Sequence, residues 1–445
     1  MHIAIIGNGI SGITAARFIR KLSDHKITVI SAETDHFFSR TALMYIYMGH
    51  MRFKETKPYE DWFWEKNRID LKRGYVEKVD TKGKQLVFKE GDTLNYDKLI
   101  LATGSKENRF GWPGQDLKRV NGLYSFQDLE QMEKYSKGLK RAVIVGGGLI
   151  GLEMAEMFHS RHIPVTILVR EKSYWSGVMP PEESAMINRE ILRHKIDLQL
   201  NEELDHIVDD GNGEACAVVT KNGNRIECGY VGLTAGVHPN IKFLEDSGIE
   251  KGRGLLVNEY LETSAPDVYA IGDCSEQRNP RPGRRGVEAI WYTGRMMGET
   301  VAYNICKKPI PYDPGIWLNS AKFMDIEYQV YGDVRAKQPE EHQSIYWEHP
   351  EGRKSIRVIY DKASKVIVGF NLMGVRFRHE VCEKWIKEKT DIETVMKNLA
   401  LANFDPEFYE KHEADVVSTY NKVSGGNLQV THKHGLNRVF AFLRS

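Results

Sequence analysis

HIAIIGNGISGITAARFIRK, residues 2–21, predicts a buried apolar strand, a glycine-rich turn and a helix in direct succession. The turn has the spacing Gly7-x-Gly9-x-x-Gly12. In such a turn the first glycine permits the tight bend, the second lets the backbone approach a pyrophosphate, and the third lets the helix pack closely on the strand. The amino end of the helix offers N–H groups to phosphates. The next predicted strand ends at Glu33, which is placed to bind an adenosine ribose.

The same pattern recurs in residues 141–161, RAVIVGGGLIGLEMAEMFHSR, with the spacing Gly146-x-Gly148-x-x-Gly151. A strand follows it at residues 164–172. One such match is weak evidence, because glycine-rich turns are common. Two matches, each between a strand and a helix, are strong evidence that the chain binds two dinucleotides.

Two further predicted strands, residues 96–105 and 265–276, end in Ala-Thr-Gly and Gly-Asp. They resemble the return strands of the FAD- and NAD(P)-dependent pyridine nucleotide-disulfide oxidoreductases, which include glutathione reductase, ferredoxin and rubredoxin reductases, NADH oxidases and nitrite reductase flavin domains. The resemblance covers roughly residues 1–305 and implies FAD in the first cradle and NAD(P)H in the second. It also implies that Asp273 hydrogen-bonds the flavin ribityl chain. The other FAD contacts that we predict are Ala102, Thr103, Gly104 and Gly272 on these strands, and Val76.

The resemblance implies an α/β fold with two Rossmann-like domains and an α+β C-terminal domain. We predict that FAD is bound by residues 1–112 and 240–305, and NAD(P)H by the inserted residues 113–239. Residues 306–445 read as short strands followed by helices. This order resembles the interface domain of the family, which implies a homodimer.

The end of the second predicted strand of the NAD(P)H domain bears on the choice of nucleotide. Val169 stands where a carboxylate would bind the 2′-hydroxyl of NAD; Arg170 follows it directly, and Lys172 is nearby. These charges favour NADPH over NADH, although Glu171 between them argues for NADH. A solvated loop charge is the alternative for Arg170. On the helix after the second cradle, Glu153 is the one candidate catalytic residue, since the resemblance directs it towards the flavin and nicotinamide; a surface role is the alternative.

The segment FFSRTALMYIYMGH, residues 37–50, contains no cysteine. In the thiol-dependent members of the family the redox cysteine lies in this segment. The corresponding position here falls at Thr41 or Ala42, neither of which can form a thiolate. By resemblance, Arg40 lies near the FAD pyrophosphate.

Two further differences agree with the missing thiol. Ile10 occupies the place of the histidine that the peroxidase-type members carry in the first glycine turn. Asp405-Pro406 stands in place of the His-Pro pair that acts as acid and base in the disulfide reductases. The sequence therefore predicts an enzyme that does not use thiol chemistry.

A loop directly after Asp273 could receive an electron acceptor. Trp291, a few residues beyond the loop, stands where ferredoxin-reductase-like members have a tryptophan near the flavin ring. An acidic ferredoxin or rubredoxin would be attracted to the charges of the loop, although a solvated loop is the alternative. The charges belong to Arg278, Arg281, Arg284 and Arg285.

The composition excludes several other classes of protein. The net charge of +1 gives no support for nucleic-acid binding. The five cysteines form no CxxC pair, which indicates a reducing compartment. No apolar run is long enough for a membrane span, and the strand that begins at residue 3 leaves no room for a signal peptide. We therefore expect a cytoplasmic protein. Histidines at 432–434 and the run 378–382 lack a complete set of metal ligands, so no metal site is predicted.

These observations favour an FAD-dependent NAD(P)H oxidoreductase without a redox-active cysteine. The acceptor that we predict is a ferredoxin- or rubredoxin-type carrier. An NAD(P)H oxidase or a reductase of quinones or other small molecules is the alternative within the same class. An alternative of another class is a flavoprotein that acts mainly by binding partners, as the apoptosis-inducing-factor-like proteins do.

Overall fold

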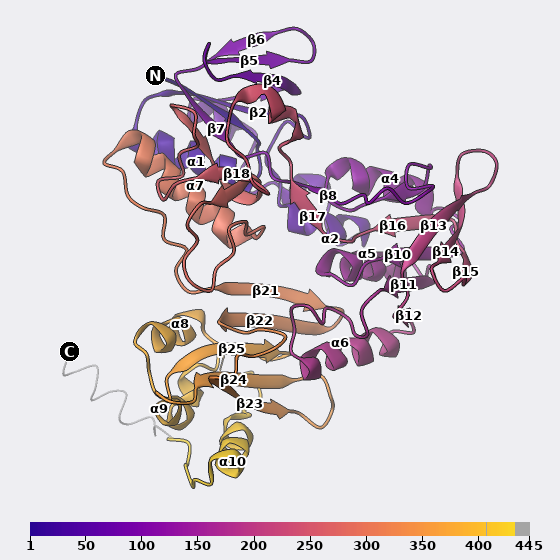
Figure 1. The fold of residues 1–445 in the computed structure, drawn as a ribbon, viewed down its shortest axis with the longest axis vertical. Helices are drawn as coiled ribbons and strands as arrows, with labels where there is room; N and C mark the ends of the chain where they lie inside the picture. The colour runs from indigo at the N-terminus through magenta and orange to yellow at the C-terminus, as the bar shows by residue number, and fades with distance from the viewer. Residues whose placement is uncertain (406, 432–445) are drawn as a thin grey trace. The chain divides into compact units, whose positions relative to one another are not determined.

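The computed structural model describes residues 1–405 and 407–431, and these form two compact units (Figure 1). The first unit comprises Met1–Glu171 and Ile196–Pro314. The second comprises Lys172–Lys195 and the chain from Gly315 onward. These units divide the chain at points other than the predicted domain limits. The domain limits themselves remain predictions.

The first sheet of the first unit is parallel and has the strand order β19-β7-β1-β2-β3. β1 is central because its run of aliphatic residues can be buried on both faces, as parallel strands require. β7 and β19, which are far apart in sequence, lie side by side in register. The five strands are β1 (His2–Ile6), β2 (Lys26–Ser31), β3 (Ile69–Arg73), β7 (Lys98–Leu101) and β19 (Val268–Ala270).

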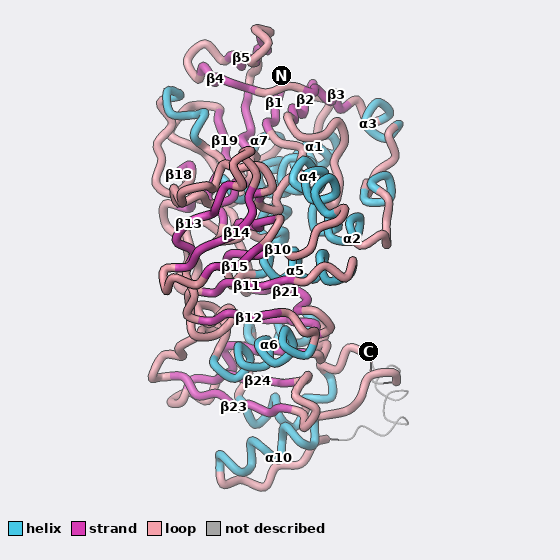
Figure 2. Tube along the Cα trace, turned by 90° about the vertical axis from the view of Figure 1, so that its right-hand side faces the viewer, coloured by secondary structure: helices cyan, strands magenta, loops and turns pink. Residues whose placement is uncertain are grey.

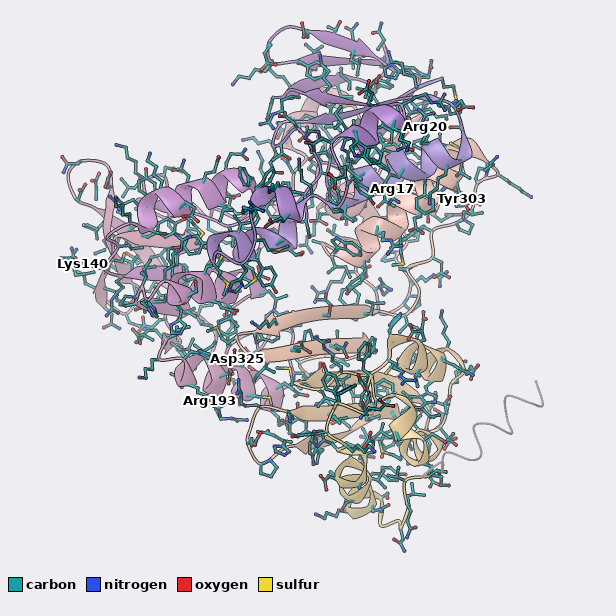
Figure 3. The ribbon with its side chains drawn as sticks, turned by 180° about the vertical axis from the view of Figure 1, so that it is seen from behind. Arg17, Arg20, Lys140, Arg193, Tyr303 and Asp325 are labelled. Atoms are coloured by element: carbon teal, nitrogen blue, oxygen red, sulfur yellow. The ribbon has the colours of Figure 1, made fainter. Side chains whose placement is uncertain are left out.

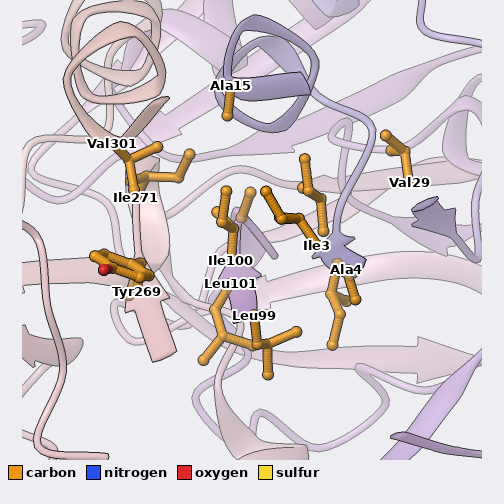
Figure 4. Packing of buried hydrophobic residues seen from close by; sticks show 14 of the residues in the cluster. Ile3, Ala4, Ala15, Val29, Leu99, Ile100, Leu101, Tyr269, Ile271 and Val301 are labelled. Atoms are coloured by element: carbon orange, nitrogen blue, oxygen red, sulfur yellow. The ribbon is translucent and has the colours of Figure 1, made fainter. Parts of the chain in front are cut away.

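Two helices, α1 (Ile10–Leu22) and α7 (Trp291–Cys306), pack closely together beside this sheet. Their close approach depends on small residues, since a Cβ atom at Gly298 would lie 2.6 Å from the carbonyl oxygen of Ser11. Figure 4 shows Ala15 of α1 and Val301 of α7 above the apolar side chains of β1 and β7. One hydrophobic core therefore joins the helices to the sheet.

Smaller elements complete this part of the first unit. The helices α2 (Leu43–Tyr47) and α3 (Trp62–Lys66) lie between β2 and β3 in sequence. Three antiparallel strands follow, and two short strand pairs connect distant segments. These strands are β4 (Val76–Asp80), β5 (Gln85–Phe88) and β6 (Thr93–Asn95), then β8 (Ser105–Glu107) with β17 (Val237–Pro239), and β18 (Leu255–Val257) with β20 (Ser275–Gln277).

The second sheet of the first unit is also parallel, with the order β12-β11-β10-β16-β9. A three-stranded antiparallel sheet accompanies it and shares its core. The parallel strands are β9 (Val120–Asn121), β10 (Ala142–Val145), β11 (Val165–Val169), β12 (Asp197–Leu200) and β16 (Tyr230–Leu233). The other elements are α4 (Phe126–Ser136), α5 (Leu149–Ser160), β13 (Leu204–Asp209), β14 (Ala215–Thr220) and β15 (Arg225–Glu227).

The second unit contains an antiparallel sheet with the order β21-β22-β25-β24-β23 (Figure 1). Figure 2 labels its strands β21, β23 and β24. Ile356 and Val358 of β24 join a core with three helices of the unit, while Arg357 between them faces the other way and pairs with Glu183 of α6 at 2.8 Å. The strands are β21 (Leu318–Phe323), β22 (Ile326–Gly332), β23 (His342–Glu348), β24 (Ser355–Asp361) and β25 (Ile367–Met373). The helices are α6 (Pro181–Arg193), α8 (His379–Lys387), α9 (Ile392–Lys397) and α10 (Glu413–Ser424).

The predicted α/β fold is confirmed. In the described part of the chain, no helix combines the length and the apolar character that crossing a membrane requires.

Candidate active site

The first glycine turn shows two kinds of glycine. Gly7 has a φ of +116°, and a Cβ atom there would lie 2.0 Å from the carbonyl oxygen of Ala102. A Cβ atom at Gly12 would lie 2.0 Å from the carbonyl oxygen of Gly7. Gly9 differs, because no heavy atom counted among the described residues lies within 4 Å of a Cβ built there. Gly9 is also the N-cap residue of α1, so no side chain caps the amides at the start of this helix. The turn thus leaves space, with helix amides beside it, where a pyrophosphate fits.

The second turn repeats this arrangement. Gly146 has a φ of +130°, and its Cβ would lie 2.6 Å from the carbonyl oxygen of Thr234 on the neighbouring strand connection. A Cβ atom at Gly148 would meet nothing within 4 Å in the described structure. Gly151 is buried in the first turn of α5. The residues of both cradles therefore fit dinucleotides.

Arg40 makes a bidentate ion pair with Glu33. Its Nη2 lies 2.6 Å from Oε2 of Glu33, and its Nη1 lies 2.9 Å from Oε1. The backbone N–H of Phe126 also donates to Oε1 of Glu33, at 2.9 Å. The guanidinium carbon lies 4.8 Å from the ring centroid of Tyr124. Because it is fixed in this way, Arg40 presents a positive charge beside the carboxylate predicted to bind the ribose.

Asp273 lies at the other end of this group. Its Oδ2 accepts hydrogen bonds from the hydroxyl of Ser105 at 2.9 Å and from the hydroxyl of Tyr124 at 3.3 Å. Burial raises the pKa of Asp273, while these two hydrogen bonds and the charge of Arg40 oppose the rise. Gly272 before it has a φ of +71°, which glycine adopts readily. The order carboxylate, guanidinium, carboxylate complements the ribose, pyrophosphate and ribityl groups of FAD.

The remaining residues predicted to contact FAD lie on several elements. Thr103 donates its hydroxyl proton to the carbonyl oxygen of Asn240 at 2.9 Å. Gly104 has a φ of +69°, and its Cβ would lie 3.0 Å from the Tyr124 hydroxyl. Val76 is buried in the core of the first unit. Trp291 is exposed at the start of α7, where its ring meets Tyr292 edge-on at 5.5 Å.

The carboxyl end of β11 carries the residues predicted to select the nucleotide. The side chain of Arg170 is 74% exposed and pairs with Glu171, with 2.7 Å between Nε and Oε1. Arg170, which favours NADPH, and Glu171, which favours NADH, thus neutralise each other's charge. A bound 2′-phosphate or a ribose diol would compete for one member of the pair.

Glu153 lies on α5, two residues after the second cradle. Burial raises its pKa to about 7, and the nearby charge of Glu156 acts in the same direction. The carboxyl group of Glu153 forms neither a hydrogen bond nor an ion pair with any other residue that the structure describes. A carboxyl group with this pKa can hold or release a proton near neutral pH.

The predicted docking loop is less positive than its sequence indicates. Arg278 pairs with Glu250, and Arg281 pairs with Asp313 at 2.8 Å. Arg284 forms a buried pair with Glu288, with 2.5 Å between Nη2 and Oε2. Arg285 is exposed and, within the described residues, has no ion pair. Most of the loop's positive charge is therefore compensated by carboxylates. Two of them are remote from the loop in sequence, and the third lies four residues after its arginine.

The segment 37–50 is partly buried. Its aromatic residues Phe37, Phe38 and Tyr47 are buried. Of the two positions predicted to correspond to the redox cysteine, Ala42 is buried and Thr41 is exposed. Elsewhere, burial raises the pKa of the thiols of Cys274 and Cys382, and that of Cys228 to about 12. These three thiols are poor nucleophiles at neutral pH.

Some predictions concern residues outside this site. Pro406 and the histidines at 432–434 lie outside the described residues. The structure brings together one group of potential metal ligands that the sequence did not indicate, Glu190, His194 and Asp325 (Figure 3 labels Asp325). Arg353 donates from Nη2 to both carboxylates, at 2.8 and 2.9 Å. The two carboxylates are therefore already paired with a cation.

Sequence reasoning missed Tyr124 and Ser105, which both contact Asp273. A local signal was present, since Ser125 and Asp128 form a capping box that starts α4 directly after Tyr124. That signal locates Tyr124 at a helix start. The contact with Asp273 becomes visible only in the folded chain.

Comparisons with known proteins agree with this geometry. The family model described as pyridine nucleotide-disulphide oxidoreductase matches residues 1–298. The assimilatory nitrate reductase electron transfer subunit of Bacillus subtilis is 26% identical over 98% of this chain and 56% of that protein. The ferredoxin reductase subunit of the 5,5'-dehydrodivanillate O-demethylase of a Sphingobium species is 31% identical over 74% of this chain and 80% of that protein.

A solved structure with the same fold is the NAD-dependent persulfide reductase from A. fulgidus, with a TM-score of 0.84 and 23% identity over 96% of this chain and 84% of that one. Other relatives include rubredoxin reductases and an NADH oxidase. The chain spans about half the length of two relatives from Bacillus subtilis, the nitrate reductase subunit and a nitrite reductase (56% and 48%).

The two open glycine positions give matched tests of the cradles. We expect Gly9→Ala to leave the thermal stability of the FAD-free protein unchanged and to weaken FAD binding at least about tenfold, because its methyl group would enter the pyrophosphate space. We expect Gly148→Ala to retain FAD and to raise KM for NAD(P)H by a similar factor. FAD titration by fluorescence and steady-state kinetics measure these effects. Gly12→Ala, whose methyl group would clash with backbone, should instead impair folding. Unchanged FAD affinity in Gly9→Ala would contradict the assignment of the first cradle.

The raised pKa of Glu153 predicts a pH-dependent stability. The folded protein binds a proton at Glu153 between about pH 4.5 and 7 that the unfolded chain does not bind, so this carboxyl group lowers stability as pH rises through that range. Glu153→Gln cannot ionise, so its Tm relative to the wild type should increase between about pH 5 and pH 8. Thermal unfolding of the FAD-free proteins at both values measures this. Glu130→Gln, on an exposed position of α4, is the control; an equal shift in both variants would contradict the assignment.

Proposed function

Because the chain belongs to the pyridine nucleotide-disulphide oxidoreductase family, we propose that Glu33, Arg40 and Asp273 hold FAD and that the second cradle holds NAD(P)H. The protein is an NAD(P)H-dependent flavin oxidoreductase that uses both cofactors. Bound there, FAD would supply hydride transfer from NAD(P)H and electron transfer to an acceptor. The observation that carries the assignment is the order of charges from Glu33 through Arg40 to Asp273, together with the open space at Gly9.

The chain's own residues orient the two cofactors. The amides at the starts of α1 and α5 attract the pyrophosphates, and the lack of a side chain at Gly9 and at Gly148 leaves room for them. Glu153 holds or releases a proton near the place where the resemblance puts the nicotinamide. These groups bind, orient and adjust charge, which is the work that a protein does around a redox cofactor.

We also propose that electrons reach the acceptor without passing through a cysteine pair. Residues 37–50 contain no cysteine, and neither Thr41 nor Ala42, the two positions predicted to correspond to the redox cysteine, carries a thiol. Thiol chemistry needs a thiolate, and burial disfavours the thiolate at Cys228, Cys274 and Cys382. The segment instead supplies the charge of Arg40.

The proposed acceptor is a small iron–sulfur or rubredoxin-type electron carrier. Relatives with names that specify ferredoxin or rubredoxin support this class. An NADH oxidase among the relatives supports oxygen as the second candidate. For the nucleotide, we propose a preference for NADPH, supported by the exposed guanidinium of Arg170 at the end of β11.

A steady-state assay with several acceptors tests the proposed carrier. With NADPH or NADH as donor, we expect reduction of a ferredoxin or a rubredoxin to exceed oxygen consumption by about tenfold or more. Arg285→Glu should raise KM for an acidic carrier several-fold at low salt and less at high salt, because a rim charge mainly affects encounter. Lys140→Glu, an exposed charge labelled in Figure 3, is the matched control. Faster turnover with oxygen than with every carrier would overturn the carrier proposal and favour the oxidase.

The nucleotide preference has its own test. Arg170→Ala removes the guanidinium that would bind a 2′-phosphate, so kcat/KM for NADPH should fall about tenfold while the value for NADH changes little or rises. Glu171→Gln, which frees Arg170 from its pair, should act in the opposite direction. A wild-type protein that prefers NADH by more than tenfold would end the argument from Arg170.

A further inference from the structure

We propose that Tyr124 is a further positioning residue of the FAD site, and that it fixes Arg40 and Asp273 in the places where they meet the cofactor. This inference rests on the proposed role of Glu33, Arg40 and Asp273. It adds Tyr124 to this group of residues, and Tyr124 comes from the segment predicted to form the NAD(P)H domain, residues 113–239. One domain would therefore supply part of the binding site of the other.

Tyr124 contacts both charged residues directly. Its hydroxyl accepts a hydrogen bond from the backbone N–H of Ser105 at 2.9 Å and donates to Oδ2 of Asp273 at 3.3 Å. Its ring lies against the guanidinium of Arg40, with 4.8 Å between the guanidinium carbon and the ring centroid. Its backbone carbonyl oxygen accepts a hydrogen bond from Nη1 of Arg40. One residue thus determines the position of a cation and of an anion.

The residues that follow Tyr124 bind the other end of the same group. The backbone N–H of Phe126 donates to Oε1 of Glu33 at 2.9 Å, and Nε2 of Gln127 donates to the carbonyl oxygen of Glu33 at the same distance. Asp128 accepts from the backbone N–H of Tyr124 at 2.9 Å and fixes the helix start. The short segment 124–127 therefore spans the distance between Glu33 and Asp273.

The chemistry of the phenol suits this position. Burial raises the pKa of Tyr124, and the negative charge of Asp273 acts in the same direction, so the hydroxyl keeps its proton and remains a donor. A hydrogen bond donated to a carboxylate favours the ionised form. The groups that act on Asp273 are Ser105, Tyr124 and Arg40, and all three favour its negative charge against burial. An ionised Asp273 accepts hydrogen bonds from the ribityl hydroxyls.

A competing explanation is that Tyr124 only stabilises the fold. It predicts a loss of thermal stability without a specific effect on FAD binding. The positioning role predicts that removal of the hydroxyl changes the affinity for FAD and the pH at which that affinity is lost. The two explanations differ in what Tyr124→Phe does, because this change keeps the ring and its contact with Arg40.

The test is a titration of the FAD-free full-length chain with FAD at several pH values, for the wild type and Tyr124→Phe. We expect the FAD dissociation constant of the variant to be about tenfold higher at neutral pH, the typical effect of a hydrogen bond to a charged group. We also expect the affinity to fall at a higher pH on acidification, because Asp273 loses a donor that lowers its pKa. Tyr303→Phe, an exposed tyrosine labelled in Figure 3, is the matched control.

Ser105→Ala provides a second variant, because it removes the other hydroxyl that donates to Asp273. It should shift the same pH profile in the same direction, and it keeps the test decisive if Tyr124→Phe does not fold. Equal FAD affinity and equal pH profiles in the wild type and in the variant that folds would overturn the inference. Equal FAD affinity in the wild type and in Gly9→Ala would instead refute the proposed FAD site. Failure of the inference about Tyr124 can therefore be distinguished from failure of the proposed site.

Discussion

The guanidinium of Arg40 is the positive charge on which the proposed FAD site depends. It is bonded to Glu33 and attracts Asp273, two carboxylates that come from distant parts of the chain. Partly buried carboxylates without a cation would be costly, since an unpaired charge in a protein interior loses several kcal/mol of hydration. The pair also explains how residues 37–50 are held in place. Although it contains no thiol, the segment positions the guanidinium of Arg40 near the end of β2.

The glycines of the two cradles divide their work between folding and binding. Gly7, Gly12 and Gly146 are required by the protein itself, because a side chain at each would meet backbone atoms. Gly9 and Gly148 are not required by any contact of that kind in the described structure, and their small size fits the proposed binding of a dinucleotide. Each Gly-x-Gly-x-x-Gly motif contains a glycine that the fold requires and a glycine with open space beside it. This combination, present in both motifs, makes the pattern a specific signal for a dinucleotide site. A turn that served only the fold would need fewer glycines.

The sequence predicted what depends on local rules and failed where distant residues meet. Strands, glycine turns and the order of the motifs follow from neighbours along the chain, so the α/β fold and both cradles could be predicted. The compensation of Arg278 by Glu250 and of Arg281 by Asp313 could not, because those carboxylates are remote in sequence. The same reason hid the contact of Tyr124 with Asp273. The ion pair between Glu183 of α6 and Arg357 also joins residues that are remote in sequence, within the second compact unit.

The compensated loop changes how an acceptor would be recognised. Charged surfaces speed association through long-range fields, and these fields require uncompensated charge. With a net charge of +1 for the whole chain and three of the loop's arginines paired, little field remains for steering. Recognition of a carrier here must then rest on short-range contacts, to which Arg285 contributes a single rim charge. Such an interface should respond to salt mainly through Arg285, and less than a docking surface with four unpaired arginines would.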